Sequence, residues 1–267
     1  MFKLKEIINF MENWAPSNLI DSWDNTGFQI GDPQKEINKI LIALDLDNNT
    51  LKKAIEGKFD LIITHHPLIF KPVNKILTVN PDEKLIIDII RNDISVYNAH
   101  SNLDLANGGV SDVLADKLGL KNTSILKETS QKIENEKILA YGYGRIGYRD
   151  TKDFKTFIEE IKESLDIESL IFYGNIEKEI RNVAVCGGSG SDFIEDASLK
   201  GADVYITGDI KYHEAQYAYE RGLNLIDVGH FHSEKFIVPV IKGYLEEKFK
   251  TLKIEVIMEQ SLPRKIY

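Results

Sequence analysis

Short apolar runs alternate with amphipathic segments along most of the chain, and this alternation predicts an α/β sheet protein. The apolar runs predict strands, and the amphipathic segments predict helices. The expected strands are residues 39–45, 60–64 and 94–98, and the expected helices are residues 1–10, 50–56, 81–91, 109–118 and 150–165. Residues 121–135 are polar and charged and predict a linker, whereas the glycine-rich run 138–148 predicts a hairpin strand.

The second half of the chain repeats the pattern of the first. Residues 37–70 align without a gap on residues 180–213, and after a shorter connection residues 94–104 align on residues 224–234. The second alignment pairs His100 with His230 and Asp104 with Glu234. Any two β-α-β units look alike, because both need apolar strands with polar ends, but periodicity alone would not place His-x-x-x-acid in both copies. We therefore expect an internal duplication.

Composition narrows the class of protein. The chain has 267 residues, of which 43% are hydrophobic and 28% are charged, and these values are typical of a globular protein with its own core. No apolar run approaches the roughly 20 residues that span a bilayer, so we expect no membrane segment. Cys186 is the only cysteine and cannot form an internal disulfide, which indicates a reducing cytoplasm. The net charge of −9 argues against a nucleic-acid binder but leaves a nucleotide ligand open.

All the histidines follow predicted strands, and the carboxyl ends of strands are where open α/β sheets bind ligands. A lone histidine there is more often a surface or core residue than a ligand, so the prediction depends on the cluster. Pro67 disfavours helical geometry at His66 and favours an extended turn, which lets His65 and His66 point into one cleft. The alternative is a turn with two exposed histidines.

Two carboxylates complete the candidate site. Asp104 follows the strand 94–98 and either offers an oxygen ligand or caps the helix that comes next. His230 and Glu234 lie one turn apart if a helix begins near His230. Three histidine nitrogens and two carboxylates suit a pair of divalent cations such as Zn, Mn or Fe, with water completing the coordination. The predicted metal ligands are His65, His66, Asp104, His230 and Glu234, and the predicted proton-transfer residues are His100 and His213.

Six short motifs, spread over the whole chain, resemble those of the NIF3-like family. The bacterial members of this family are often named GTP cyclohydrolase 1 type 2 homologues. The motifs are WDNTG at 23–27, THHP at 64–67, HSNLD at 100–104, GGSGSD at 187–192, TGDIKYHEA at 207–215 and GHFHSE at 229–234. THHP, HSNLD and GHFHSE in this order carry most of the resemblance.

The resemblance implies a fold, a ligand set and an assembly. It implies two intertwined, duplicated α/β/α lobes with mixed sheets, and a homohexameric ring whose sites face an internal cavity. The family's metal positions fall on the same five residues, with Glu234 bridging, His66 and Asp104 on one metal, and His65 and His230 on the other. The middle segment is short, so the chain resembles compact members that lack an inserted domain. The expected divisions are a first lobe at 1–125, a second lobe at 126–228, and residues 229–267 completing the first lobe.

The expected function is that of a metal-dependent hydrolase of a nucleotide-like small molecule, and the resemblance implies GTP cyclohydrolase activity. Lys71 and Lys211 follow two of the motifs and either contact a triphosphate or are solvated. One alternative is a non-enzymatic metal-binding or protein-interaction scaffold, since the eukaryotic namesake is described as a protein-interacting factor. Another is a phosphoesterase or amidohydrolase. The ligand set favours catalysis, because five ligands to two metals leave positions open for water and substrate.

Overall fold

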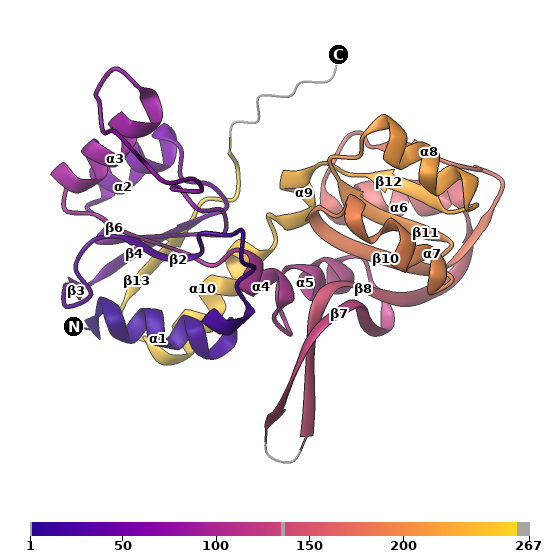
Figure 1. Ribbon diagram of the computed structural model, residues 1–267, viewed down its shortest axis with the longest axis horizontal. Coiled ribbons are helices and arrows are strands. Elements are labelled where there is room, and N and C mark those ends of the chain that lie inside the picture. The colour runs from indigo at the N-terminus through magenta and orange to yellow at the C-terminus, as the bar shows by residue number, and fades with distance from the viewer. Residues whose placement is uncertain (1, 135–136, 261–267) are drawn as a thin grey trace. The chain divides into compact units, whose positions relative to one another are not determined.

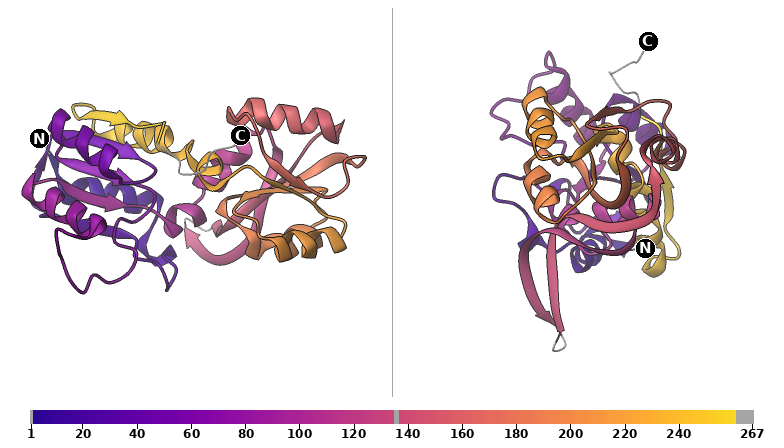
Figure 2. Two further views of the ribbon diagram at one scale, coloured as in Figure 1. Left: turned by 90° about the horizontal axis from the view of Figure 1, so that it is seen from above. Right: turned by 90° about the vertical axis from the view of Figure 1, so that its right-hand side faces the viewer.

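The computed structural model describes residues 2–134 and 137–260, which divide into two units. Unit 1 runs to Leu103 and resumes at Ile237, and unit 2 is the segment from Asp104 to Phe236. Each unit is a mixed sheet with helices on both faces (Figures 1 and 2). The expected α/β class with two α/β/α lobes is therefore confirmed. Within the described residues, every helix is too short or too polar to span a bilayer.

Unit 1 is built on a five-stranded sheet in the order β13-β4-β5-β6-β2, with β2 antiparallel to its neighbour and the others parallel. The strands are β13 (Lys253–Val256), β4 (Lys39–Ala43), β5 (Leu61–Thr64), β6 (Ser95–Asn98) and β2 (Gly27–Ile30), and a separate ribbon pairs β1 (Phe2–Lys3) with β3 (Glu36–Ile37). The helices are α1 (Leu4–Trp14), α2 (Asn48–Gly57), α3 (Pro81–Arg91) and α10 (Ile237–Lys248), with a short 3-10 turn at Ser17–Leu19.

Alternate residues of the central strands face opposite sides of this sheet. Leu41, Ile62 and Val96 pack against the buried faces of α2 and α3. Helices α1 and α10 contact each other, and α10 also contacts β4 and β13, so this pair covers the other side (Figure 1). Because both sides are covered, the parallel strands are apolar throughout and read as continuous hydrophobic runs.

Unit 2 is built on a six-stranded sheet in the order β7-β8-β10-β11-β12-β9, whose central strands β10, β11 and β12 are parallel. The strands are β7 (Lys121–Glu134), β8 (Lys137–Asp153), β10 (Glu179–Ser189), β11 (Val204–Gly208), β12 (Asn224–Asp227) and β9 (Ile171–Tyr173). Helices α5 (Val110–Lys117) and α6 (Phe154–Leu165) share one core with the sheet, and α7 (Ile194–Leu199) and α8 (Tyr212–Glu220) share another. A 3-10 turn at Ser191–Phe193 leads into α7, and α9 is His230–Glu234.

The prediction of a linker at 121–135 is wrong. Residues 121–134 form β7, one arm of a long antiparallel hairpin with β8. Figure 1 shows this hairpin projecting beyond the rest of its sheet. Most side chains of β7 are exposed, including those from Glu128 to Lys132. A strand that is solvated on both faces has no apolar alternation, and for this reason its sequence resembles a linker.

The two units divide at other positions than 125 and 228. Helix α5 packs on β8 and β10, and its Leu114 and Ala115 belong to the core of unit 2. The corresponding helix after the second copy, α10, returns to unit 1. The last helix of each copy therefore belongs to the other unit, and in this sense the two lobes are intertwined. The short helix α4 (Ser101–Leu105) contains the division.

Strand register supports the duplication. Ile40 pairs with Leu61 in unit 1, and Val183 pairs with Val204 in unit 2, at the same offset of 143. The second alignment, of residues 94–104 on 224–234, is wrong by one residue. Leu61 pairs with Ser95 and Val204 pairs with Asn224, so Ser95 matches Asn224 at an offset of 129. Helices α4 and α9 begin at Ser101 and His230, at the same offset. The predicted pairings of His100 with His230 and of Asp104 with Glu234 are therefore wrong by one residue.

One aspartate in each copy closes the same turn. The carboxylate of Asp60 accepts hydrogen bonds from the backbone N–H groups of Asn38 (2.8 Å) and Lys39 (2.9 Å). Asp203, 143 residues later, accepts from the backbone N–H groups of Arg181 (3.1 Å) and Asn182 (2.8 Å). Both aspartates lie at the start of the second strand and hold the start of the first.

We expect Asp60→Ala and Asp203→Ala to destabilise the protein by similar amounts. Each change leaves two backbone donors without their charged acceptor, which costs about 1–3 kcal/mol. Urea unfolding of the two variants and of the exposed-site control Asp82→Ala would check this. Losses that differ greatly between the two variants would contradict the equivalence of the two turns.

Candidate metal centre

Unit 1 gathers three histidines at the carboxyl ends of two neighbouring parallel strands. His65 and His66 follow β5, and His100 follows β6. One ring nitrogen from each lies within 4.8 Å of the others. The ring centroids are 5.0 Å apart for His65 and His66, 5.2 Å for His65 and His100, and 5.5 Å for His66 and His100. The turn at THHP therefore directs both of its rings to one place, as its sequence predicts.

Local hydrogen bonds make this turn. The backbone N–H of His66 donates to the carbonyl oxygen of Leu44 (3.0 Å), and the hydroxyl of Thr64 donates to the carbonyl oxygen of His66 (2.7 Å). These bonds tie the residues after β5 to the end of the neighbouring strand β4. His65 is buried completely, and His66 is partly exposed.

Each histidine of this cluster is oriented through its Nδ1 atom. Nδ1 of His65 lies 2.8 Å from the carbonyl oxygen of Ala99, which can only accept, so this nitrogen carries the proton. Nδ1 of His66 lies 2.7 Å from Oδ1 of Asp45, and Nδ1 of His100 lies 3.0 Å from Oδ1 of Asp24. Partners of this kind fix the ring and direct Nε2 to a metal. Sequence reasoning did not find Asp24 or Asp45, although Asp24 lies in the WDNTG motif.

Asp24 is the most strongly held carboxylate of unit 1. Its side chain is fully buried and accepts hydrogen bonds from His100, from the backbone N–H of Ser101 (3.1 Å), and from the hydroxyls of Ser101 (2.6 Å) and Thr26 (2.6 Å). Burial by itself would raise the pKa of Asp24, but the hydrogen bonds from His100, Ser101 and Thr26 outweigh it and hold the pKa well below its usual range. Asp24 is therefore ionised at neutral pH.

We expect the stability advantage of the wild type over Asp24→Asn to depend on pH in the acid range. The pKa of Asp24 is lower in the folded protein than the ordinary value of 3.8, so its contribution is complete above that value and is lost as the pH falls below it. Urea unfolding of the metal-free proteins at a series of pH values would measure this. An advantage that stays constant or grows well below pH 3.8 would contradict the assignment.

Unit 2 carries the remaining predicted ligands. Nε2 of His230 lies 3.1 Å from Oε2 of Glu234, one helical turn later on α9, as the spacing predicts. Carboxylate oxygens of Asp104 and Glu234 lie within 4.8 Å of each other. Glu234 is only 4% exposed. Nδ1 of His230 lies 2.8 Å from Oδ2 of Asp209, so this histidine is oriented in the same way as those of unit 1.

Glycines of two motifs make room for α9. A Cβ atom on Gly188 would lie 2.3 Å from Oε1 of Glu234, and Gly188 has a φ of 66°, in the left-handed region. A Cβ atom on Gly208 would lie 2.7 Å from the backbone nitrogen of His230. The backbone N–H of Gly188 also donates to the hydroxyl of Ser233 (2.9 Å). The GGSGSD and TGD motifs therefore shape the surroundings of His230 and Glu234, a role that sequence reasoning did not assign.

The charges of unit 2 favour a cation. Burial, together with the negative charges of Asp104 and Glu234, raises the pKa of Cys186 to about 12. Cys186 is therefore a neutral thiol, and the acidic pair is the source of ligands in this region. Two carboxylates held close together with little solvent repel each other, and a divalent cation relieves that repulsion. Imidazole nitrogens and carboxylate oxygens are ordinary ligands of Zn, Mn and Fe, so the residues fit such a metal.

The other predicted residues lie elsewhere in their units. His213 is exposed near the start of α8 and contacts the ring of Tyr212. Lys211, just before this helix, lies 3.8 Å from Glu214. Lys71 lines a hollow of unit 1 that also contains Lys75, Asp82 and Glu83, so the charges there are balanced. Neither lysine is part of a positively charged cluster of the kind that would bind a triphosphate.

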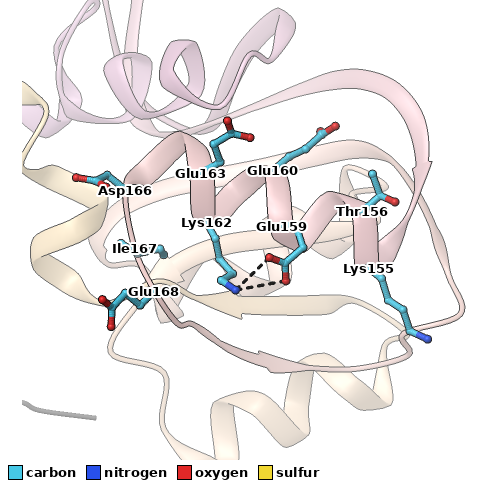
Figure 3. Close-up of a pocket in the computed structure, with 9 residues that line it drawn as sticks. All are labelled: Lys155, Thr156, Glu159, Glu160, Lys162, Glu163, Asp166, Ile167 and Glu168. Atoms are coloured by element: carbon cyan, nitrogen blue, oxygen red, sulfur yellow. Dashed lines mark hydrogen bonds and ion pairs between the residues drawn. The ribbon is translucent and has the colours of Figure 1, made fainter. Parts of the chain in front are cut away.

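A hollow of about 910 Å³ on unit 2 is not connected with the predicted ligands. It runs along α6 (Figure 3) and is lined by solvated side chains of residues 155–168. Glu159 and Lys162 form an ion pair there, at 3.1 Å from Oε2 to Nζ. Its other charged side chains are mostly acidic. A row of this kind on one helix is the usual solvated face of an amphipathic helix.

The fold and these side chains define a class of protein: a duplicated α/β/α protein with histidine and carboxylate groups suited to divalent metals. A family model described as Duf34/NIF3 (NGG1p interacting factor 3) matches residues 2–263, and the chain belongs to this family.

Relatives in sequence and in structure agree with this membership. The chain is 42% identical to the GTP cyclohydrolase 1 type 2 homolog of Clostridium perfringens over 248 residues, which cover 92% of each chain. It is 39% identical to the protein of the same name from Streptococcus pneumoniae, over 85% of this chain and 84% of the relative. The crystal structure of a Bacillus cereus protein related to NIF3 superposes with a TM-score of 0.94 at 29% identity, over 100% of this chain and 99% of that one.

Proposed function

We propose that the protein is a metal-dependent hydrolase of a nucleotide-like small molecule. The observation that carries the proposal is the shared orientation of the candidate ligands. His65, His66 and His230 each have Nδ1 held by an oxygen acceptor, which directs Nε2 to a metal. Structural histidines have no need of a common arrangement of this kind. The name of the bacterial relatives, GTP cyclohydrolase 1 type 2 homolog, supports GTP as the first substrate to test.

On the resemblance, the proposal assigns about two divalent cations to the five predicted ligands, His65, His66, Asp104, His230 and Glu234. Following the resemblance, His66 and Asp104 would hold one metal, His65 and His230 would hold the other, and Glu234 would be a ligand of both. When bound, such a pair supplies a water of lowered pKa and polarises the bond to be cut.

The chain's own residues have distinct parts in this proposal. Asp45 and Asp209 orient two of the ligands through hydrogen bonds of 2.7 Å and 2.8 Å. His100 is next to the other histidines of unit 1 and is held by the ionised Asp24, so it is the better candidate for moving a proton. His213 remains a second candidate, on the exposed start of α8.

A screen of metal-loaded protein against nucleotides, phosphoesters and amides tests the proposed activity. We expect turnover of a nucleotide-like compound that disappears in Glu234→Ala and after chelation. Turnover of only simple phosphoesters or amides would contradict the proposed nucleotide-like substrate but would still support a metal-dependent hydrolase. Metal binding without turnover of any compound would favour the alternative of a metal-binding or interaction scaffold, which the family description as an interacting factor supports.

We also propose, on the resemblance, that the protein is a cytoplasmic homohexamer. The single, buried cysteine is compatible with a reducing compartment. Light scattering of the purified full chain should give the mass of six subunits at micromolar concentration. A stable monomer would contradict the proposed hexameric ring.

A further inference from the structure

Trp23 and Phe70 are two large aromatic side chains that unit 1 leaves exposed, by 59% and 44%. Single exposed apolar residues are common on protein surfaces. These two, however, face each other, with ring centroids 6.2 Å apart and planes inclined by 56°. Rings at this angle do not stack, so they form an open corner with two aromatic walls.

The corner adjoins the histidine cluster of unit 1. The centroid of Trp23 lies 6.0 Å from that of His100, and the centroid of Phe70 lies 6.5 Å from it. Both aromatic planes are nearly perpendicular to the imidazole, at 84° and 85°. A planar ring in the corner would therefore lie next to His100, whose own ring is 5.2 Å from His65 and 5.5 Å from His66.

Hydrogen bonds fix the backbone beneath both rings. Trp23 directly precedes the buried Asp24, whose backbone N–H donates to the carbonyl oxygen of Asp21 (2.9 Å). Phe70 follows Ile69, whose N–H donates to Oε1 of Gln29 (3.0 Å) and whose carbonyl oxygen accepts from Nε2 of Gln29 (3.1 Å). A second amide, that of Asn25, also donates to this carbonyl. The exposed rings thus stand on ordered supports, which lowers the entropic cost of binding a ligand.

We propose that Trp23 and Phe70 bind the planar heteroaromatic ring of a nucleobase-like ligand, which stacks on the face of Trp23 and meets Phe70 with its edge. Stacking on an aromatic side chain tolerates different bases, because every base has a π face. The charges of the neighbouring hollow are balanced between Lys71 and Lys75 on one side and Asp82 and Glu83 on the other. Recognition at this place therefore depends on the ring and not on a polyphosphate. The role of this ring as part of a substrate rests on the proposed function.

Intrinsic tryptophan fluorescence reports directly on the corner. Trp14 is the other tryptophan and lies half-buried against Tyr244, so Trp14→Phe leaves Trp23 as the only indole. Titration of this full-length variant with GMP or AMP should quench the fluorescence to saturation. Ribose 5-phosphate, which has the sugar phosphate without the base, should leave it unchanged. The measurement needs no turnover and can be made with and without metal.

Two further changes in this background separate stacking from general effects. Phe70→Ala should weaken the binding of GMP and AMP roughly tenfold, which corresponds to the loss of one aromatic contact. Leu77→Ala removes an equally exposed apolar side chain from the same loop and should leave the affinity unchanged. The proposal is overturned if nucleotides give no saturable quenching, if ribose 5-phosphate quenches equally, or if Phe70→Ala binds as tightly as its parent. Quenching without metal-dependent turnover would overturn only the proposed hydrolase, and turnover without quenching would overturn only the aromatic site.

Discussion

Glu234→Gln should abolish the stabilisation of the protein by divalent metal and leave the metal-free protein at least as stable as the wild type. Glutamine has nearly the volume of glutamate but lacks its charge. In the metal-free state the change removes a buried carboxylate that lies within 4.8 Å of Asp104, and so relieves a like-charge repulsion. In the metal-bound state it removes a ligand that the proposal places on both ions.

The size of this effect follows from mass action. Metal at a hundred times its dissociation constant stabilises the wild type by about 2.7 kcal/mol for each site. Changing even a partner of a metal ligand weakens binding by about 10–100-fold, and loss of the ligand itself should exceed that range. At a hundredfold weaker affinity the gain falls to about 0.4 kcal/mol. Urea unfolding with and without metal measures both values.

Asp203→Ala is the matched control for this experiment. It removes another carboxylate of unit 2, which serves backbone donors at the opposite end of β11. Its loss of stability should be the same with and without metal. A Glu234→Gln protein that is destabilised in both states would show that Glu234 is structural, and would contradict its role as a ligand.

Gly188→Ala should weaken the binding of metal and lower the stability of the protein. The new methyl group would lie 2.3 Å from Oε1 of Glu234, so the carboxylate must move. The φ of 66° adds strain for a residue with a side chain, at about 1–2 kcal/mol. We expect a loss of roughly this size in urea unfolding, together with metal affinity that is at least about tenfold weaker.

Gly201→Ala separates the two causes. Gly201 has a similar φ of 73°, but a Cβ atom there would have no neighbour within 4 Å. This variant should show the conformational loss and keep its metal affinity, as measured by calorimetric titration. Equal metal affinities for Gly188→Ala and Gly201→Ala would mean that Gly188 does not hold the position of Glu234.

Local patterns predicted much of the fold. The predicted helix 81–91 has the same bounds as α3. Proline in the first helical position marks its start in the sequence. In the structure the side chain of Asn80 caps this end by accepting a hydrogen bond from the N–H of Asp82. The strands β4, β5 and β6 were predicted to within two residues at each end, since strands covered on both faces are continuously apolar.

Features that depend on distant parts of the chain were not predictable in the same way. Most side chains of the hairpin arm β7 are exposed, so its sequence has no apolar alternation from which the strand or its register could be predicted. The exchange of α5 and α10 between the units depends on which sheet each helix packs against, and both helices have the same kind of apolar stripe. Only contacts in the folded protein decide between the two sheets.

The candidate site was predictable in its histidines and carboxylates but not in their supports. Strand ends and the His-x-x-x-acid spacing identify His230 and Glu234 in the sequence. Asp24 and Asp45 lie 76 and 21 residues from the histidines that they orient, and no local pattern joins such pairs. The steric role of Gly188 also becomes visible only when α9 is in place.

The metal content of the full chain and three variants tests the central claim most directly. After loading with Zn or Mn and removal of excess ion, elemental analysis of the wild type should give about two ions per chain. His66→Ala in unit 1 and His230→Ala in unit 2 should each retain about one, and Glu234→Ala should retain almost none, because it is assigned to both ions. A wild type that never holds more than one ion, or a His66→Ala protein that still holds as much metal as the wild type, would contradict a paired centre built from these five residues.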